Sequence, residues 1–183
     1  STAFSRNFLS LSFAALRGDP TWGELVDDDL LDSALTAAAG APSDRTQHQQ
    51  AYDAQLALCN RAFERYREAR SRATIDTREL DRFREHNRFW LDPDAMYEAL
   101  SREYGTTDWR GWSGPHAEVD RALYCPAGAA RDAASARRAE LTRRYAEDLE
   151  RYALIQYLVH RQHQEFHRRA NEMGLSLYAD LQV

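Results

Sequence analysis

Apolar residues recur every three or four positions along most of this chain, and this spacing constrains the fold more than any other feature of the sequence. The clearest series consists of Tyr52, Leu56, Cys59, Phe63 and Tyr66. Because an α-helix turns once in about 3.6 residues, the series lies on one helical face, which predicts a helix with a single buried stripe. Alternating spacing is found only near the two ends of the chain.

The expected helices start and stop at recognisable signals. Asp27, Asp28 and Asp29 put negative charge where a helix dipole favours it, and that helix is expected to stop at Gly40. Ser43 is a candidate cap for the helix that contains the apolar series.

Two more helices are expected in the middle of the chain. Asp76 followed by Glu79 resembles a capping box and opens one of them. Asp92 followed by Pro93 has the form of a cap and a proline at the first helical position, so it predicts the start of a separate helix that ends at Gly105.

The last third is also helical in pattern. A short helix is expected near residues 118–124, and residues 131–173 form either one long helix or two that join near Glu147 and Asp148. Gly174 ends this region. Residues 27–173 are therefore expected to be helices.

Extended structure is expected only at the ends. Phe8 to Leu16 alternates loosely, which predicts a short strand or an extended segment. Leu175 to Val183 has the pattern of a strand, with Asp180 near its carboxyl end. A helix, a glycine turn and a strand with an acidic residue near its end is the pattern of one step of a βα barrel.

Composition narrows the class of protein. The net charge of −5 argues against a nucleic-acid partner, which usually requires a strong basic excess. No run reaches the roughly 18 apolar residues of a membrane span, and the first residues lack the features of a signal peptide. Cys59 and Cys125 are too few and too far apart for a disulfide framework, so a cytoplasmic protein is expected.

Three histidines are a candidate metal site. His160, His163 and His167 lie three and four residues apart, so a helix places them on one face, where two of them could chelate a metal ion. The sequence lacks an HExxH pattern and a nearby acidic pair, so packed or surface histidines are the favoured interpretation, and we expect no metal.

Trp109, Trp112 and Asp180 are the candidate substrate-binding residues. Exposed tryptophans stack on sugar rings, although tryptophans in a long loop also serve as anchors to the core. Glycosidic chemistry needs two carboxylates, and Asp180 alone is not a pair, so local hydrogen bonding is its other interpretation. The sequence contains no Ser/His/Asp arrangement, GxSxG motif or phosphate-binding glycine loop.

The order of motifs resembles the 4-α-glucanotransferases of the amylomaltase family, also called disproportionating enzyme. The strongest part is residues 154–158 (LIQYL) with Gln162, followed by residues 170–174 (ANEMG) and 179–183 (ADLQV). The family shows FLQYL…QW, A-N-x-x-G and GDLPI or RDLAV at these places. Gln182, His163 and Ser10 depart from its usual residues. Three segments nearer the amino terminus also occur in the order that the family shows. They are residues 5–9 (SRNFL), residues 83–100 with their WL pair, and the tryptophan loop.

The resemblance implies a mainly α fold, a helical insertion subdomain of a (β/α)8-barrel enzyme. Residues 1–183 would form a single subdomain in which residues 1–16 lead in from the barrel and residues 175–183 lead back to it. The enzyme, a glycosyltransferase of carbohydrate metabolism, would transfer α-1,4-glucan chains between maltodextrins by retaining double displacement without a cofactor. Asp180 would be a supporting carboxylate near the sugar. The nucleophile and the acid/base would lie outside this segment, so no catalytic residue is expected within it.

The implied partners are an α-glucan or maltodextrin substrate and the remaining barrel of the same polypeptide, with no nucleic acid and no membrane. A non-catalytic helical module that binds another protein is the alternative hypothesis. A metalloprotein built on the three histidines is a third.

Overall fold

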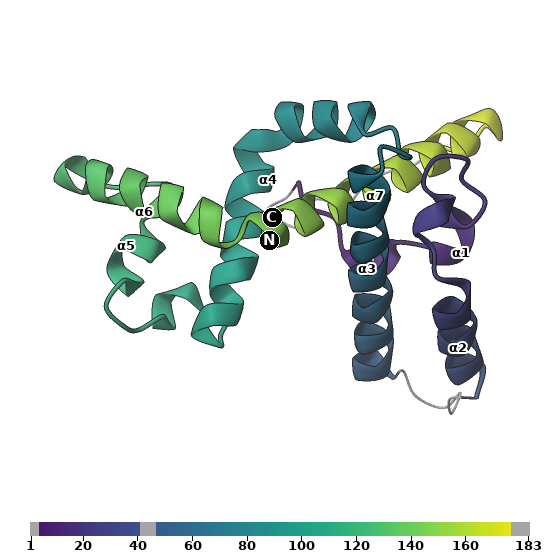
Figure 1. Cartoon of the computed structure of the whole chain (residues 1–183), viewed down its shortest axis with the longest axis horizontal. Helices are drawn as coiled ribbons and strands as arrows, with labels where there is room; N and C mark the ends of the chain where they lie inside the picture. The colour runs from purple at the N-terminus through teal and green to yellow at the C-terminus, as the bar shows by residue number, and fades with distance from the viewer. Residues whose placement is uncertain (1–3, 41–46, 177–183) are drawn as a thin grey trace. The chain divides into compact units, whose positions relative to one another are not determined.

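The fold is built from helices and the loops between them (Figure 1). The computed structural model describes residues 4–40 and 47–176, and within these ranges no residue forms a strand. The prediction of a mainly α chain is confirmed. The α-helices are α1 (Phe13–Leu16), α2 (Asp28–Ala39), α3 (His48–Ser71), α4 (Arg78–Tyr104), α5 (Ala117–Arg121), α6 (Arg131–Arg144) and α7 (Ala146–Glu172). The short 3-10 helices are η1 (Phe8–Ser10), η2 (Gly23–Leu25), η3 (Trp109–Gly111) and η4 (Gly128–Ala130).

Several helix boundaries fall where the sequence predicted them. The carboxylate of Asp27 accepts a hydrogen bond from the backbone N–H of Leu30 at 3.1 Å and caps α2, which ends at Gly40. The last helical region consists of two helices, α6 and α7, that meet at Tyr145. Gly174 follows α7 with a φ of +76°, a left-handed conformation that glycine adopts without strain.

The amino-terminal segment does not form the short strand that was one of its two predicted forms. Phe8 to Ser10 and α1 are helical turns separated by the extended residues Leu11 and Ser12. Ser12 accepts a hydrogen bond from the backbone of Ala15, and this local cap closes a turn that a strand would lack.

The separate helix expected at Asp92 and Pro93 is also wrong. Both residues lie inside α4, which runs without a break from Arg78 to Tyr104 and is bent in Figure 1. The carboxylate of Asp92 accepts a hydrogen bond from Arg88 Nε at 3.1 Å instead of capping a new helix. Proline removes one helical hydrogen bond and bends a helix without having to end it.

The buried stripe of α3 is shorter than predicted. Cys59, Phe63 and Tyr66 are buried, whereas Leu56 is half-buried and Tyr52 is 42% exposed. The spacing was therefore correct for the second half of the series only. The expected cap Ser43 and the end of the expected strand, residues 177–183 with Asp180, lie outside the described residues.

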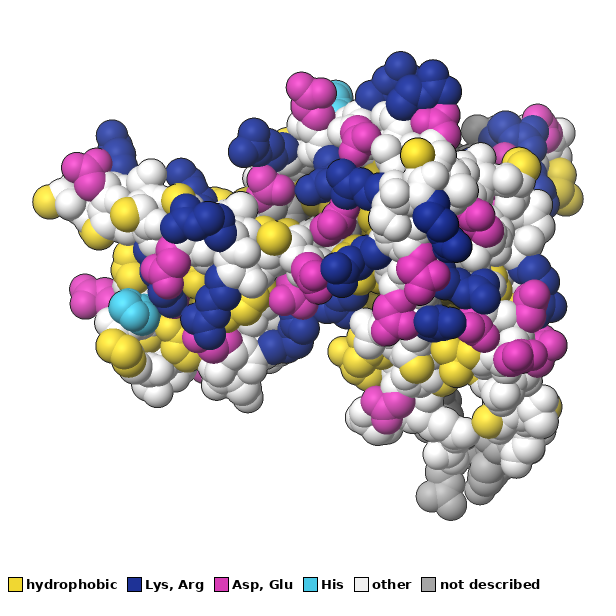
Figure 2. All heavy atoms as spheres, in the orientation of Figure 1, with side chains coloured by type: hydrophobic (Ala, Val, Ile, Leu, Met, Phe, Trp, Pro, Cys, Tyr) yellow, Lys and Arg dark blue, Asp and Glu magenta, His cyan; other side chains and the backbone are white. Residues whose placement is uncertain are grey.

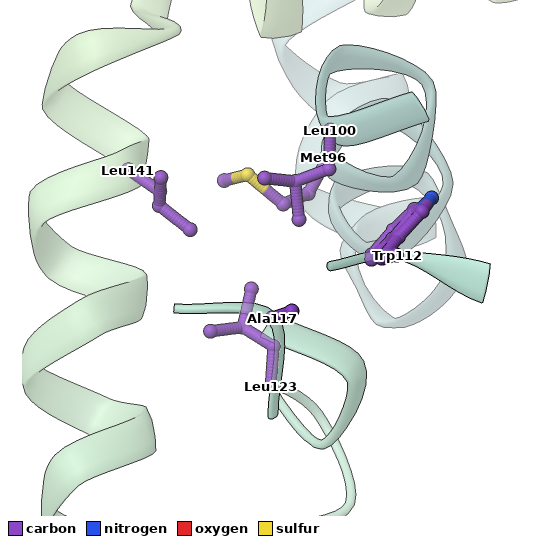
Figure 3. Packing of buried hydrophobic residues seen from close by; sticks show 6 residues of the cluster. All are labelled: Met96, Leu100, Trp112, Ala117, Leu123 and Leu141. Carbon is purple, nitrogen blue, oxygen red and sulfur yellow. The ribbon is translucent and has the colours of Figure 1, made fainter. Parts of the chain in front are cut away.

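The chain divides into two compact units. Unit 1 consists of Ser1–Ser5 and Leu80–Leu154, and unit 2 consists of Arg6–Glu79 and Ile155–Val183. The core of unit 1 is drawn in Figure 3, where side chains from α4, α5, α6 and the intervening loops meet: Met96, Leu100, Trp112, Ala117, Leu123 and Leu141.

The core of unit 2 is aromatic. Trp22 is 1% exposed, and its ring centroid lies 5.3 Å from that of Tyr157 and 6.5 Å from that of Tyr66. The side-chain amide of Gln156 makes two hydrogen bonds to the backbone of Arg6, each 2.9 Å long. It accepts from the Arg6 N–H and donates to the Arg6 carbonyl. Gln162 does the same for Ser12, so α7 fixes the extended amino-terminal residues of this unit.

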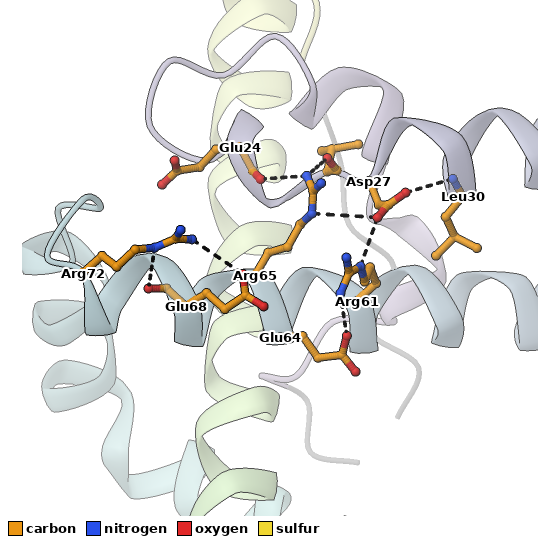
Figure 4. Close-up of polar contacts among 9 residues, drawn as sticks. Glu24, Asp27, Leu30, Arg61, Glu64, Arg65, Glu68 and Arg72 are labelled. Atoms are coloured by element: carbon orange, nitrogen blue, oxygen red, sulfur yellow. Dashed lines mark hydrogen bonds and ion pairs between the residues drawn. The ribbon is translucent and has the colours of Figure 1, made fainter.

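A network of charged side chains joins η2, α2 and α3 in unit 2 (Figure 4). Arg61 Nε lies 3.0 Å from Asp27 Oδ2, and Arg65 donates to the carbonyls of Glu24 and Val26. On the face seen in Figure 2, acidic and basic side chains are interspersed. Within the described ranges, none of the helices combines the length and apolar content needed to cross a membrane.

Candidate functional site

The loop between α4 and α5 carries both predicted tryptophans, and it presents them differently. Trp109 begins η3 and is 39% exposed, whereas Trp112, three residues later, is 4% exposed. From the sequence, each tryptophan had two alternative roles: it could stack on a sugar or anchor the loop to the core. Their burial separates the two roles, because only Trp109 has a surface that a ligand could reach.

Trp112 is the anchor of the loop. Its ring stacks on Tyr104 with centroids 4.9 Å apart and lies 6.0 Å from the ring of Tyr97. The indole Nε1 donates a hydrogen bond to the carbonyl of Thr106 at 3.0 Å, which satisfies its only polar group. Figure 3 shows this ring among the apolar side chains of the unit 1 core.

Further hydrogen bonds fix the backbone on both sides of Trp109. Arg121 Nη1 donates to the carbonyl of Trp112 at 2.8 Å and to that of Arg110 at 3.3 Å. The carboxylate of Asp108 accepts from the backbone N–H of Arg110 at 3.1 Å and caps η3. A loop held in this way keeps Trp109 in one position without burying it.

A buried polar group supports the loop from the core. Tyr104, on which Trp112 stacks, donates its hydroxyl to Asp120 Oδ2 at 2.7 Å. Arg137 donates to both oxygens of the same carboxylate, from Nε at 2.9 Å and from Nη2 at 3.0 Å. Burial raises the pKa of Tyr104 to about 12, with a further contribution from the bond to Asp120, and the ion pair raises the pKa of Arg137.

This group was missed at the level of sequence. Asp120 and Arg137 are 17 residues apart and belong to helices whose contact the sequence does not reveal. The surrounding residues 117–123 (AEVDRAL) are of mixed polarity, so they single out neither Asp120 as buried nor Arg137 as its partner. Buried charges of this kind are paired and hydrogen-bonded, as here.

Chemically, Trp109 is a partly exposed aromatic ring with a hydrogen-bond donor over one of its two faces. The guanidinium carbon of Arg110 lies 4.3 Å from the centroid of the Trp109 ring, which is the geometry of a cation–π contact. A sugar ring has apolar faces and a rim of hydroxyl groups, and an aromatic ring flanked by Arg donors matches both features.

The three histidines lie along α7 in unit 2. The ring centroids of His163 and His167 are 4.4 Å apart, and His160 is half-buried. Burial lowers the pKa of His160 and of His163, and the nearby charge of Arg6 lowers both further. Across residues 4–40 and 47–176, no group of three or more His, Cys, Asp or Glu side chains is arranged to hold a metal ion.

A comparison with known protein families matches residues 1–183, the whole chain, to the family described as 4-alpha-glucanotransferase. The chain belongs to this 4-alpha-glucanotransferase family. The resemblance that was drawn from residues 154–183 and the earlier motifs is thereby confirmed. No curated protein and no solved structure matches the chain.

Membership of the 4-alpha-glucanotransferase family places the chain among enzymes that act on glucans, and the barrel context of its helices follows from the family. Of the predicted site residues, the structure describes Trp109 and Trp112, and it brings the second under the loop that carries the first. Asp180 lies outside the described residues.

Proposed function

We propose that this chain is the helical part of a 4-alpha-glucanotransferase that moves α-1,4-glucan segments between maltodextrins by retaining double displacement. The observation that carries the proposal is the family match over residues 1–183. The exposed ring of Trp109 on a fixed loop supports it, because a surface suited to a sugar is found within a chain of a glucan-acting family.

We further propose that the segment assists glucan binding and does not itself carry out the transfer. Retaining chemistry requires two carboxyl groups about 5 Å apart on either side of an accessible bond. The buried carboxylate of Asp120 is already engaged by Arg137 and Tyr104, and its side chain is fully buried. Asp94 is buried as well, and Tyr152 interacts with it. Both carboxylates are buried and contact other side chains of the fold, so neither is proposed as the nucleophile or the acid/base.

Trp109 and Asp180 are the proposed glucan contacts, and Trp112 acts on the glucan only through the loop that it anchors. The barrel of the same polypeptide is the proposed partner of the helices. The cytoplasmic setting expected from the sequence remains part of the proposal, and no cofactor is included in it.

The test compares the chain with a longer protein encoded by the same reading frame. Each is incubated with maltotriose, and glucose and longer maltodextrins are measured. We expect products from the longer protein and none from residues 1–183, whose folding is verified by its helical circular dichroism. Disproportionation by residues 1–183 alone would overturn the proposed division of roles. A folded longer protein with the barrel but without activity would overturn the proposed enzyme.

A further inference from the structure

A groove in unit 1, distinct from the tryptophan loop, has the composition of a carbohydrate-binding surface. Its volume is about 910 Å³, within the size range of small-molecule sites. It lies along residues 81–96 of α4 and is also lined from α6, from the start of α7 and from Tyr124 in the segment between α5 and α6. Its lining includes Arg88, Phe89, Asp92, Tyr124, Ser135 and Arg138.

The most exposed large apolar side chain of the groove is Phe89. It is 68% exposed, although Trp90, the next residue, is 4% exposed. Phe4 contacts the Phe89 ring edge-on with centroids 5.3 Å apart and restricts its movement without covering it. An aromatic ring held in place at the rim of a groove is a stacking surface for a ligand with an apolar face.

The backbone of α4 adds an acceptor at the same place. Pro93 lines the groove one helical turn after Phe89 and has no N–H, so the carbonyl of Phe89 cannot receive its usual i+4 hydrogen bond. Phe89 and Pro93 both line the groove. The carbonyl of Phe89 therefore lacks one helical hydrogen bond, at a residue that lines the groove.

Donors and further acceptors complete the surface. Arg88 and Asp92 form an ion pair at 3.1 Å that is largely exposed, with 79% and 50% of their side chains accessible. The guanidinium of Arg138 lies 5.5 Å from the centroid of the Tyr124 ring, and the Tyr124 hydroxyl donates to the carbonyl of Asp92 at 3.3 Å. These planar polar groups suit the paired hydroxyls of a sugar, and they are poorly matched to an apolar helix.

We propose that this groove is an accessory glucan-binding site, in which a glucose unit stacks on Phe89 while its hydroxyl groups bond to the Phe89 carbonyl, Arg88 and Arg138. The ligand class rests on the proposed function, since it is the glucan of the family. The site adds a second point of attachment to the one at Trp109. Two attachment points along one chain raise the effective concentration of long glucans and have no such effect on short ones.

The test is native electrophoresis of residues 1–183 through gels with and without amylose, together with titration by maltoheptaose. Phe89→Ala is expected to weaken the affinity by about fivefold, which is the value of one aromatic contact. Phe89→Tyr, which keeps the ring, is expected to retain the affinity. Phe166→Ala is the matched control, because Phe166 is 58% exposed and belongs to unit 2; it is expected to have no effect.

Three results would overturn the accessory site. The first is an unchanged affinity in Phe89→Ala, and the second is no retardation of the parent chain by amylose. The third is a loss caused by Trp109→Ala alone, which would leave Trp109 as the glucan contact. None of these three results bears on the proposed transfer reaction. That reaction is tested separately, by the products that the longer protein forms from maltotriose.

Discussion

Arg137 and Asp120 form a two-point ion pair in which the arginine side chain is 7% exposed and the carboxylate is fully buried. Both oxygens of the carboxylate are used, one by Arg137 Nε and the other by Arg137 Nη2 and the hydroxyl of Tyr104. Such a pair costs desolvation energy, and its effect on stability shows mainly when one partner is removed.

Arg137→Met is therefore expected to lower the free energy of unfolding by about 3–5 kcal/mol, because it leaves the carboxylate of Asp120 buried without a counter-charge. Adding Asp120→Leu to this variant should recover part of the loss, since no buried charge then remains. Urea unfolding followed by tryptophan fluorescence measures both variants.

Arg143→Ala is the control for this prediction. Arg143 lies on the same helix, α6, but is exposed, so its removal should change the unfolding free energy by less than about 0.5 kcal/mol. If Arg137→Met were no more destabilising than Arg143→Ala, the ion pair would not be a structural element.

Substituting the two tryptophans of the loop one at a time should separate an effect on stability from an effect on glucan binding. Trp112→Ala removes a buried ring from the core of unit 1 and is expected to cost about 3–5 kcal/mol in urea unfolding. Trp109→Ala should leave the unfolding free energy within about 0.5 kcal/mol of the parent because the residue is partly exposed. The same variant should weaken maltoheptaose binding by about fivefold. Equal loss of stability in the two variants would contradict the assigned roles.

Helical spacing and capping residues were sufficient to predict most helices of this chain. Asp27, Gly40 and Gly174 mark boundaries that depend on residues close in sequence, so local chemistry fixes them. Pro93 misled the prediction, because a proline that bends a helix and a proline that starts one follow the same residues.

The candidate site was only partly accessible to sequence reasoning. The loop with Trp109 and Trp112 was identified from its residue types, but their opposite exposures depend on contacts with Tyr104 and Tyr97 on α4. The groove at Phe89 depends on α4 and α6 meeting, which no local pattern encodes. In both cases the sequence pattern did not reveal contacts between different elements of the fold.

Alkaline pH should destabilise the chain through the partly buried Tyr104. Burial raises the pKa of Tyr104 from 10.0 to about 12, so the folded chain binds this proton more tightly than the unfolded chain does. The stabilisation is complete below a pH of about 10 and is lost as the pH rises toward about 12. Urea midpoints across this range should fall, and Tyr104→Phe should reduce the slope. Tyr52→Phe, at an exposed position, should leave the slope unchanged; a reduction there would contradict the assignment.

Acidic pH should destabilise unit 2 through two of its histidines. Burial and the charge of Arg6 lower the pKa of His160 and His163, so the unfolded chain binds their protons more tightly. The stabilisation is complete above the ordinary histidine pKa of 6.5 and is lost as the pH falls below it. Arg6→Gln should raise both pKa values in an NMR titration, whereas Arg72→Gln should not. Unchanged pKa values in Arg6→Gln would remove Arg6 as a cause of the shifts and leave burial and the neighbouring histidines.

Asp27 combines two stabilising roles that a pair of substitutions can separate. Its carboxylate caps α2 by accepting from the backbone N–H of Leu30, and it pairs with Arg61 at 3.0 Å and Arg65 at 3.8 Å (Figure 4). Asp27→Asn keeps a side-chain oxygen for the cap and removes the charge, whereas Asp27→Ala removes both.

The expected order of urea midpoints is therefore parent, Asp27→Asn, then Asp27→Ala, with the larger step between Asn and Ala because ion pairs at partly exposed positions contribute little. The salt dependence of these midpoints tests how the effect of Asp27 is divided between its cap and its charge. The hydrogen bond from Arg61 holds the pKa of Asp27 below its ordinary value, and added salt screens the charge interaction but not the cap. The gap between parent and Asp27→Asn should shrink in high salt, while the gap between Asp27→Asn and Asp27→Ala should remain. If the gap between Asp27→Asn and Asp27→Ala shrank equally in high salt, the stabilising effect of Asp27 would come from its charge and not from its cap.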